Sequence, residues 1–161
     1  MSRFLFAVTA AALVACTQPA PEQAAAPPAP PDSAALRVTL VAMSEQLKTA
    51  YLAGDAPAVA AHFTEDARAE YAGFPSAVGR AAIQSTYATY FAANKLTVAE
   101  WTFGAVNPIS ADLATAGGTY HSYAPDSKPA HAWWRWAAAY RKGADGQYRL
   151  SYSIAFPDST K

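Results

Sequence analysis

The latter part of the chain reads as four long runs of strand-forming residues, and no other feature restricts the possible folds so strongly. Each run is about ten residues long, contains many aromatic and β-branched residues, and is separated from the next by turn signals. Long strands joined by short turns pair as antiparallel hairpins. The sequence therefore predicts an antiparallel sheet built from residues 95–106, 113–123, 130–142 and 147–156.

Helical patterns come before these strands. Asp32 and Ser33 can cap a helix, and apolar residues then recur every three or four positions until Gly54 stops the pattern. A second helix is predicted from Asp55 onward, with Val59 and Phe63 on one side of it. The residues beyond it predict a short strand over 67–71 and a third helix over 80–93.

This order of elements indicates an α+β domain. We expect three N-terminal helices packed in a strongly curved antiparallel sheet. Together, the helices and the sheet form a cone-shaped α+β barrel. A sheet that wraps around helices in this way leaves a cavity between the two layers.

The first residues carry the signature of export. Arg3 precedes a short apolar run that is too short to span a membrane, which is typical of a secretory signal. The run ends in Leu13-Val14-Ala15-Cys16, the pattern that the lipoprotein-processing peptidase reads. We expect residues 1–15 to be a signal peptide and Cys16 to carry the lipid. The alternative is an ordinary signal peptide, with Cys16 an incidental thiol.

The lipidated cysteine places the protein in the cell envelope, held by a lipid anchor. Thr17 stands where aspartate would favour the inner membrane, so we expect the outer membrane, facing the periplasm. Residues 16–33 are rich in proline and alanine and predict a tether. Residues 34–161 are then one folded domain. The 12 basic and 12 acidic side chains cancel, which excludes the basic footprint of a nucleic-acid-binding protein.

Several short motifs, in this order, resemble those of a known superfamily. They are Ala53-Gly54-Asp55, Phe63-Thr64-Glu65-Asp66-Ala67, Gly79-Arg80-Ala81-Ala82-Ile83, Gly118-Thr119-Tyr120 and Asp145-Gly146-Gln147-Tyr148. Their order and spacing are similar to the nuclear transport factor 2-like superfamily, in its SnoaL-like and ketosteroid-isomerase-like branch. The resemblance implies the cone fold. It implies no particular activity, because the superfamily includes enzymes, association domains and binding proteins.

The resemblance allows the isomerase chemistry to be tested at each position. The tyrosine of that chemistry falls on Leu47, its carboxylate base on Tyr71 and its buried acid near Ala138. All three positions lack the required group, so the sequence argues against ketosteroid isomerase activity. Tyr87 matches a tyrosine that lines the pocket in that family, and it can serve either the pocket or the core.

Other catalytic groups are sparse. His62, His121 and His131 show no metal-binding spacing, so we expect neither a metal nor another cofactor. His121 and Glu70 are the candidates for a catalytic base. The alternative for each is a hydrogen-bonding or solvated side chain, since Glu70 and the Tyr71 position point to opposite faces of a strand.

An aromatic run over 131–140 is the most unusual local feature. Strand alternation puts Trp134, Trp136 and Tyr140 on one face and Trp133 with Arg135 on the other. We expect the first set to line a ligand pocket together with Leu47, Phe63, Tyr71, Tyr87 and Tyr120. The alternative is that these rings fill the cone completely.

Three functions remain open. The favoured one is a membrane-anchored domain that binds a small, largely apolar or aromatic ligand in a conical pocket. The second is a SnoaL-like enzyme of proton transfer, dehydration or cyclisation. The third is a homodimeric interaction module that uses the convex sheet face around Trp133, because tryptophan and arginine are enriched at binding surfaces.

Overall fold

The computed structural model describes residues 28–161, which form three helices and six strands. The predicted signal peptide, the predicted lipid acceptor Cys16 and most of the predicted tether lie outside the described residues. Within them, no helix is both long enough and apolar enough to cross a bilayer.

The first helix follows the prediction closely. Helix α1 spans Ser33–Ala53, and the Asp32 carboxylate accepts hydrogen bonds from the backbone N–H groups of Ala34 and Ala35 at 2.9 and 3.0 Å. These N–H groups have no partner within the helix, so the carboxylate stabilises this end. Gly54 ends the helix in the left-handed conformation, with φ of 66°. The apolar stripe of α1 is buried against the sheet.

The second helix is shorter than predicted. Helix α2 spans Ala56–Ala61, His62 is its C-cap, and strand β1 spans Phe63–Tyr71. The prediction that Phe63 lies on this helix is therefore wrong. Its spacing from Val59 fits one helical face, but Phe63 instead pairs with Leu150 of another strand, and its carbonyl oxygen accepts hydrogen bonds from the Arg80 guanidinium. A short strand that was not predicted, β2 over Ala77–Val78, pairs with β1.

The third helix and the remaining strands follow the predicted order. Helix α3 spans Arg80–Ala93. The later strands have the following bounds: β3 Val98–Pro108, β4 Leu113–Tyr123, β5 His131–Lys142 and β6 Tyr148–Pro157. The observed limits of these strands differ from the predicted ones by at most three residues.

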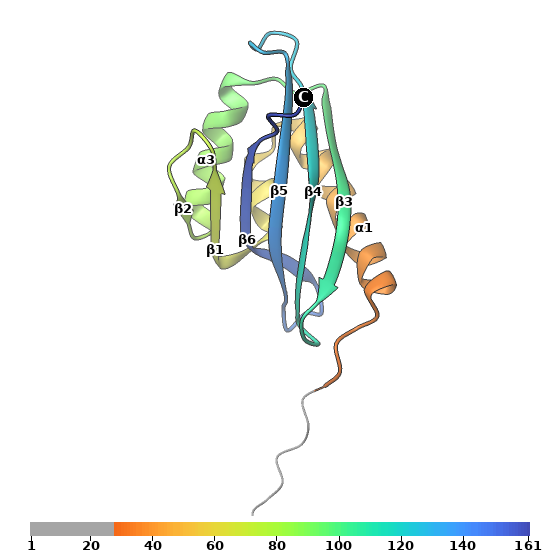
Figure 1. Ribbon diagram of the computed structural model, residues 1–161. Helices are drawn as coiled ribbons and strands as arrows, with labels where there is room; N and C mark the ends of the chain where they lie inside the picture. The colour runs from red at the N-terminus through yellow and green to blue at the C-terminus, as the bar shows by residue number, and fades with distance from the viewer. Residues whose placement is uncertain (1–27) are drawn as a thin grey trace, which may run out of the picture.

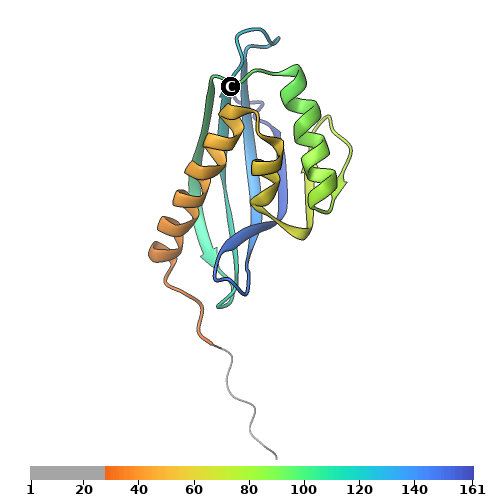
Figure 2. The ribbon, with the colours of Figure 1, turned by 180° about the vertical axis from the view of Figure 1, so that it is seen from behind.

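All six strands form one sheet, in the order β2-β1-β6-β5-β4-β3 (Figure 1). The strands from β3 to β6 run as an antiparallel meander, and only the β1–β6 pair is parallel. Seen from behind, the three helices all lie over the same face of the sheet (Figure 2). The sheet curls around them and stays open between its two edge strands. The predicted α+β cone is confirmed, with the parallel pair as an added detail.

An irregularity in β3 fixes the position of helix α1. The β3–β4 register shifts between Phe103 and Val106, which leaves Gly104 and Ala105 without a partner in the ladder. The Arg37 guanidinium of α1 donates to the carbonyl oxygens of Gly104 and Phe103, at 2.5 and 2.9 Å. These two hydrogen bonds tie the helix to the edge strand and so help to form one wall of the cavity.

Candidate ligand-binding site

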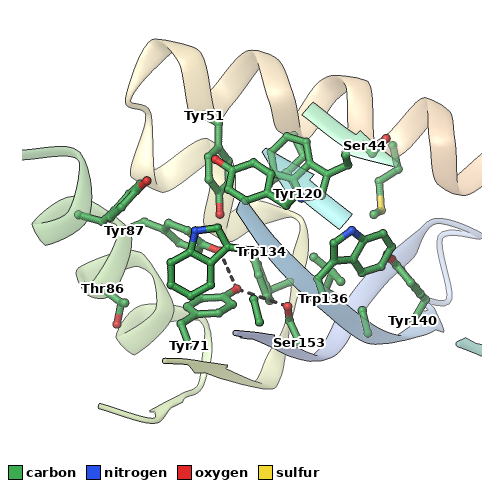
Figure 3. A pocket seen from close by; sticks show the side chains of 18 of the residues that line it. Ser44, Tyr51, Tyr71, Thr86, Tyr87, Tyr120, Trp134, Trp136, Tyr140 and Ser153 are labelled. Atoms are coloured by element: carbon green, nitrogen blue, oxygen red, sulfur yellow. Dashed lines mark hydrogen bonds between the residues drawn. The ribbon is translucent and has the colours of Figure 1, made fainter. Parts of the chain in front are cut away.

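A cavity of about 110 Å³ lies between the helices and the concave face of the sheet. Figure 3 shows its side chains converging from α1, α3 and strands β1, β4, β5 and β6. Aromatic rings supply most of its wall. The residues that line it are Met43, Ser44, Leu47, Tyr51, Phe63, Tyr71, Phe74, Thr86, Tyr87, Tyr90, Trp101, Phe103, Tyr120, Trp134, Trp136, Ala138, Tyr140, Leu150, Ser153 and Ala155.

Strand alternation places the aromatic run as expected. Trp134, Trp136 and Tyr140 face the cavity, whereas Trp133 lies on the outer face and is 40% exposed. All eight residues that the sequence put forward for ligand binding line this one cavity, Phe63 included, although it lies on a strand and not on a helix. Their position is thus established, and their role in binding stays a prediction.

The three positions that carry the isomerase chemistry in the resembling family also face the cavity. They hold Leu47, Tyr71 and Ala138. None of the lining residues among the described part of the chain is an aspartate, glutamate, histidine, lysine, arginine or cysteine. The cavity therefore offers hydroxyl groups and rings, but no side chain that is charged at neutral pH.

Three of its hydroxyl groups form a short chain. The oxygens of Tyr71 and Tyr87 lie 2.6 Å apart, and the Tyr71 hydroxyl donates to Ser153 Oγ over a long 3.5 Å (Figure 3). Burial raises the pKa of Tyr71, and it raises that of Tyr87 well above the ordinary value. Both phenols therefore stay protonated at neutral pH and act as hydrogen-bonding groups.

The other polar groups on the wall fall into two classes. Ser44 and Thr86 donate to carbonyl oxygens of their own helices, and Trp136 Nε1 donates to the Thr119 carbonyl oxygen at 3.0 Å. These groups are satisfied by the protein. Four tyrosine hydroxyls, those of Tyr51, Tyr90, Tyr120 and Tyr140, make no hydrogen bond of normal geometry among the described residues. Tyr51 has the Tyr87 hydroxyl nearby, and Tyr90 and Tyr120 have that of Ser122.

The hydroxyl of Tyr140 makes no hydrogen bond within residues 28–161, although the residue is only 3% exposed. The hydroxyl of Tyr120 is buried and likewise has no partner of normal geometry among the described residues. Burial raises the pKa of Tyr120, and the nearby Ser122 hydroxyl partly offsets this rise. Burial, followed by the proximity of Tyr71, raises the pKa of Tyr140.

Tyr51 was not put forward as a site residue, yet it lies at the centre of the aromatic wall. Its ring makes edge contacts with Tyr87 and Trp101, with ring centres 5.2 and 5.0 Å apart. The signal was present in the sequence, because Tyr51 continues the apolar stripe of the first helix. Trp101 and Phe103 also line the cavity, and the alternation of their strand places them on its inner face.

The two candidates for a catalytic base lie away from the cavity. His121 is on the outer sheet face, where it stacks on Trp133 at 3.8 Å and its Nε2 lies 3.1 Å from His131 Nδ1. Glu70 pairs with Arg68 and accepts a hydrogen bond from Ser76, and these two contacts lower its pKa. Neither side chain is among those that line the cavity.

A metal site is not evident either. Within the part of the chain that the structure describes, no group of three or more histidine, cysteine, aspartate or glutamate side chains is arranged to hold a metal ion. The two histidines on the outer face have nearly parallel rings, with 7° between the planes and 5.3 Å between the ring centres.

Comparison with solved structures identifies the fold. A ketosteroid isomerase-like protein from Erwinia carotovora atroseptica SCRI1043 is 22% identical with a TM-score of 0.64, over 76% of this chain and 95% of that one. ActVI-ORFA from Streptomyces coelicolor is 21% identical with a TM-score of 0.59, over 77% and 98%. A domain of unknown function with a cystatin-like fold from Nostoc punctiforme PCC 73102 is 19% identical with a TM-score of 0.66, over 79% and 80%.

At these identities the likeness concerns the fold and carries no activity. A search of the curated proteins found no match. The model of the SnoaL-like domain family, in contrast, matches residues 44–150, which include nearly the whole cavity wall. With its nuclear transport factor 2-like cone, the chain belongs to the SnoaL-like domain family.

Proposed function

We propose that this protein is a membrane-anchored, extracytoplasmic domain that binds a small, largely apolar or aromatic molecule in the cone. One observation carries the proposal: the described cavity wall consists mainly of aromatic rings and contains no side chain that is charged at neutral pH. Ligand pockets are typically apolar with a few placed polar groups, which is the arrangement found here.

Binding explains this wall better than catalysis does. A general acid or base works best when its pKa lies near the operating pH. Burial moves the pKa values of Tyr51, Tyr71 and Tyr87 upward, away from neutrality, and the candidates His121 and Glu70 lie outside the cavity. The enzymatic alternative of proton transfer, dehydration or cyclisation thus lacks a group that ionises in the right place.

The anchor rests on the sequence. Cys16 follows a signal-like run, and a lipid on this residue would hold the domain at the cell envelope, on the outer membrane facing the periplasm. Labelling of growing bacteria with radioactive palmitate tests this assignment. We expect label on the wild-type chain and none on Cys16→Ser. A labelled Cys16→Ser chain would contradict it.

A second copy of the chain is the proposed protein partner. No helix covers the outer face of the sheet (Figure 1). Trp133 and Phe156, on β5 and β6, have 40% and 47% of their surface exposed. Large exposed rings on one face are typical of interaction surfaces. Sedimentation velocity tests this: we expect a dimer that Trp133→Ser with Phe156→Ser converts to a monomer. A wild-type monomer at high concentration would exclude the dimer.

Native mass spectrometry tests ligand binding most directly. The Cys16→Ser chain, produced in a bacterial envelope and purified gently, is compared with the same sample after denaturing extraction. We expect an additional mass that extraction removes. A chain without an additional mass that also takes up no apolar probe would overturn the proposal and favour the interaction module.

A further inference from the structure

We infer that the ligand is an uncharged molecule of about one aromatic ring, with an oxygen atom that accepts a hydrogen bond from Tyr140. This inference rests on the proposed binding function and makes it more specific. It combines three properties of the cavity: its size, its lack of charge and the hydrogen bonds of its wall.

The size limits the ligand to roughly one ring. The cavity measures about 110 Å³. An engineered protein cavity of about 150 Å³ lined by apolar side chains holds benzene, whereas pockets for drug-sized molecules measure about 300–1,000 Å³. A fused-ring compound would therefore have to displace rings of the wall, and these rings pack against one another through Tyr51.

The absence of charge on the wall excludes ions. A carboxylate or ammonium group that enters an apolar cavity loses its hydration, and no opposite charge among the described lining residues compensates for that loss. The tyrosines supply none at neutral pH, since burial raises the pKa of Tyr87 and of Tyr140. The ligand is therefore neutral in its bound form.

The hydrogen bonds of the wall single out Tyr140. Ser44 and Thr86 donate to helix carbonyls, and Tyr71 and Tyr87 bond to each other. The Tyr140 hydroxyl keeps its proton and has no acceptor within residues 28–161. A donor on the cavity wall that has no partner in the protein can gain a hydrogen bond from an oxygen that a ligand brings. Tyr51, Tyr90 and Tyr120 also make no hydrogen bond of normal geometry, but each has a hydroxyl group nearby, that of Tyr87 or of Ser122. The indole N–H groups of Trp101 and Trp134 also have no acceptor among the described residues, but both side chains are only half-buried.

Phenol and toluene provide a matched pair of probes, because they have nearly the same shape and differ in that phenol carries a hydroxyl group where toluene carries a methyl group. Tryptophan fluorescence measures the binding of each probe to two full-length proteins. One carries Cys16→Ser alone, and the other carries Cys16→Ser together with Tyr140→Phe. We expect Tyr140→Phe to weaken phenol binding about five-fold relative to toluene, in line with one net hydrogen bond. We expect the control Tyr152→Phe, on the exposed outer face, to change neither affinity.

Two further probes test charge and size on the unmodified cavity. At pH 7 we expect benzoate to bind at least about ten-fold more weakly than phenol, and 2-naphthol to bind more weakly than its greater apolar surface predicts. These comparisons need no variant at position 140, so they hold even where Tyr140→Phe fails to fold.

The outcomes separate this inference from the proposed function. If no probe binds, toluene included, the binding function itself is overturned. If toluene and phenol bind but benzoate binds as tightly as phenol, the ligand class is overturned while the binding function stands. An unchanged ratio of phenol to toluene in folded Tyr140→Phe overturns the role of Tyr140 in the same way.

Discussion

Replacing Ala138 with leucine decides whether the cone is open or already filled. Ala138 lies on β5, is 6% exposed and borders the cavity. An empty cavity lowers the free energy of unfolding by about 24 cal/mol per Å³, so a cavity of about 110 Å³ costs about 2.6 kcal/mol of stability. The leucine adds three carbon atoms to this space, each worth about 0.8 kcal/mol when buried.

The expected net effect is a stabilisation of about 1.5 kcal/mol, because ordering the leucine side chain costs about 0.5–1 kcal/mol. The free energy of unfolding of a small domain falls by about 1.5 kcal/mol for each 1 M of urea, so this stabilisation should raise the urea midpoint by about 1 M. Loss of phenol binding should accompany the gain in stability, because the same side chain occupies the space that the ligand needs.

The matched control is Ala137→Leu, one residue earlier on the same strand. Ala137 is exposed on the outer face, so this change should alter the free energy of unfolding by no more than about 0.5 kcal/mol. An Ala138→Leu protein that is less stable by about 1–3 kcal/mol would refute the reasoning. Overpacking of that size means that the rings already fill the cone.

Four further outcomes follow from the structure. Tyr140→Phe should leave stability unchanged or raise it by about 1 kcal/mol in urea unfolding, because it removes a hydroxyl that has no partner within residues 28–161. Burial raises the pKa of the cavity tyrosines, that of Tyr87 above all, so the folded state holds their protons more tightly than the unfolded state does. Between pH 7 and about 9 these tyrosines are protonated in both states, so the free energy of unfolding should stay constant. It should then fall as the pH rises through about 10, as urea midpoints measured between pH 8 and 11 would show. Glu70→Gln and His121→Ala should each leave phenol affinity within about two-fold in a fluorescence titration, because both residues lie off the cavity. Gly118→Ala should destabilise by about 2–4 kcal/mol in thermal unfolding, because its Cβ would lie 1.8 Å from the Thr102 carbonyl oxygen.

The parts of the fold that could be predicted are those with local causes. Asp32 and Gly54 mark the ends of α1 because capping chemistry depends on the residue itself and on its immediate neighbours. Trp134 and Trp136 both point into the cavity because side chains two residues apart on a strand lie on the same face of the sheet. Both kinds of signal act over a few residues, and a single sequence displays them directly.

The parts that could not be predicted depend on distant partners. Phe63 fits the apolar face of a helix, and only its pairing with Leu150 makes it the first residue of a strand. The parallel β1–β6 pair and the two-residue strand β2 have the same origin. The free hydroxyl of Tyr140 is also a long-range property, because it results from the absence of any acceptor on the surrounding elements.

The parallel pairing of β1 with β6 also determines when the cavity can exist during folding. The meander from β3 to β6 forms through neighbouring hairpins, which close quickly, whereas Phe63 and Leu150 pair across the whole domain. Strand β1 contributes Phe63 and Tyr71 to the wall, and β6 contributes Leu150 and Ser153. As the chain is synthesised, the cavity therefore has no complete wall until β6 has emerged. A ligand of this cavity can therefore bind only to chains in which β6 has already paired with β1.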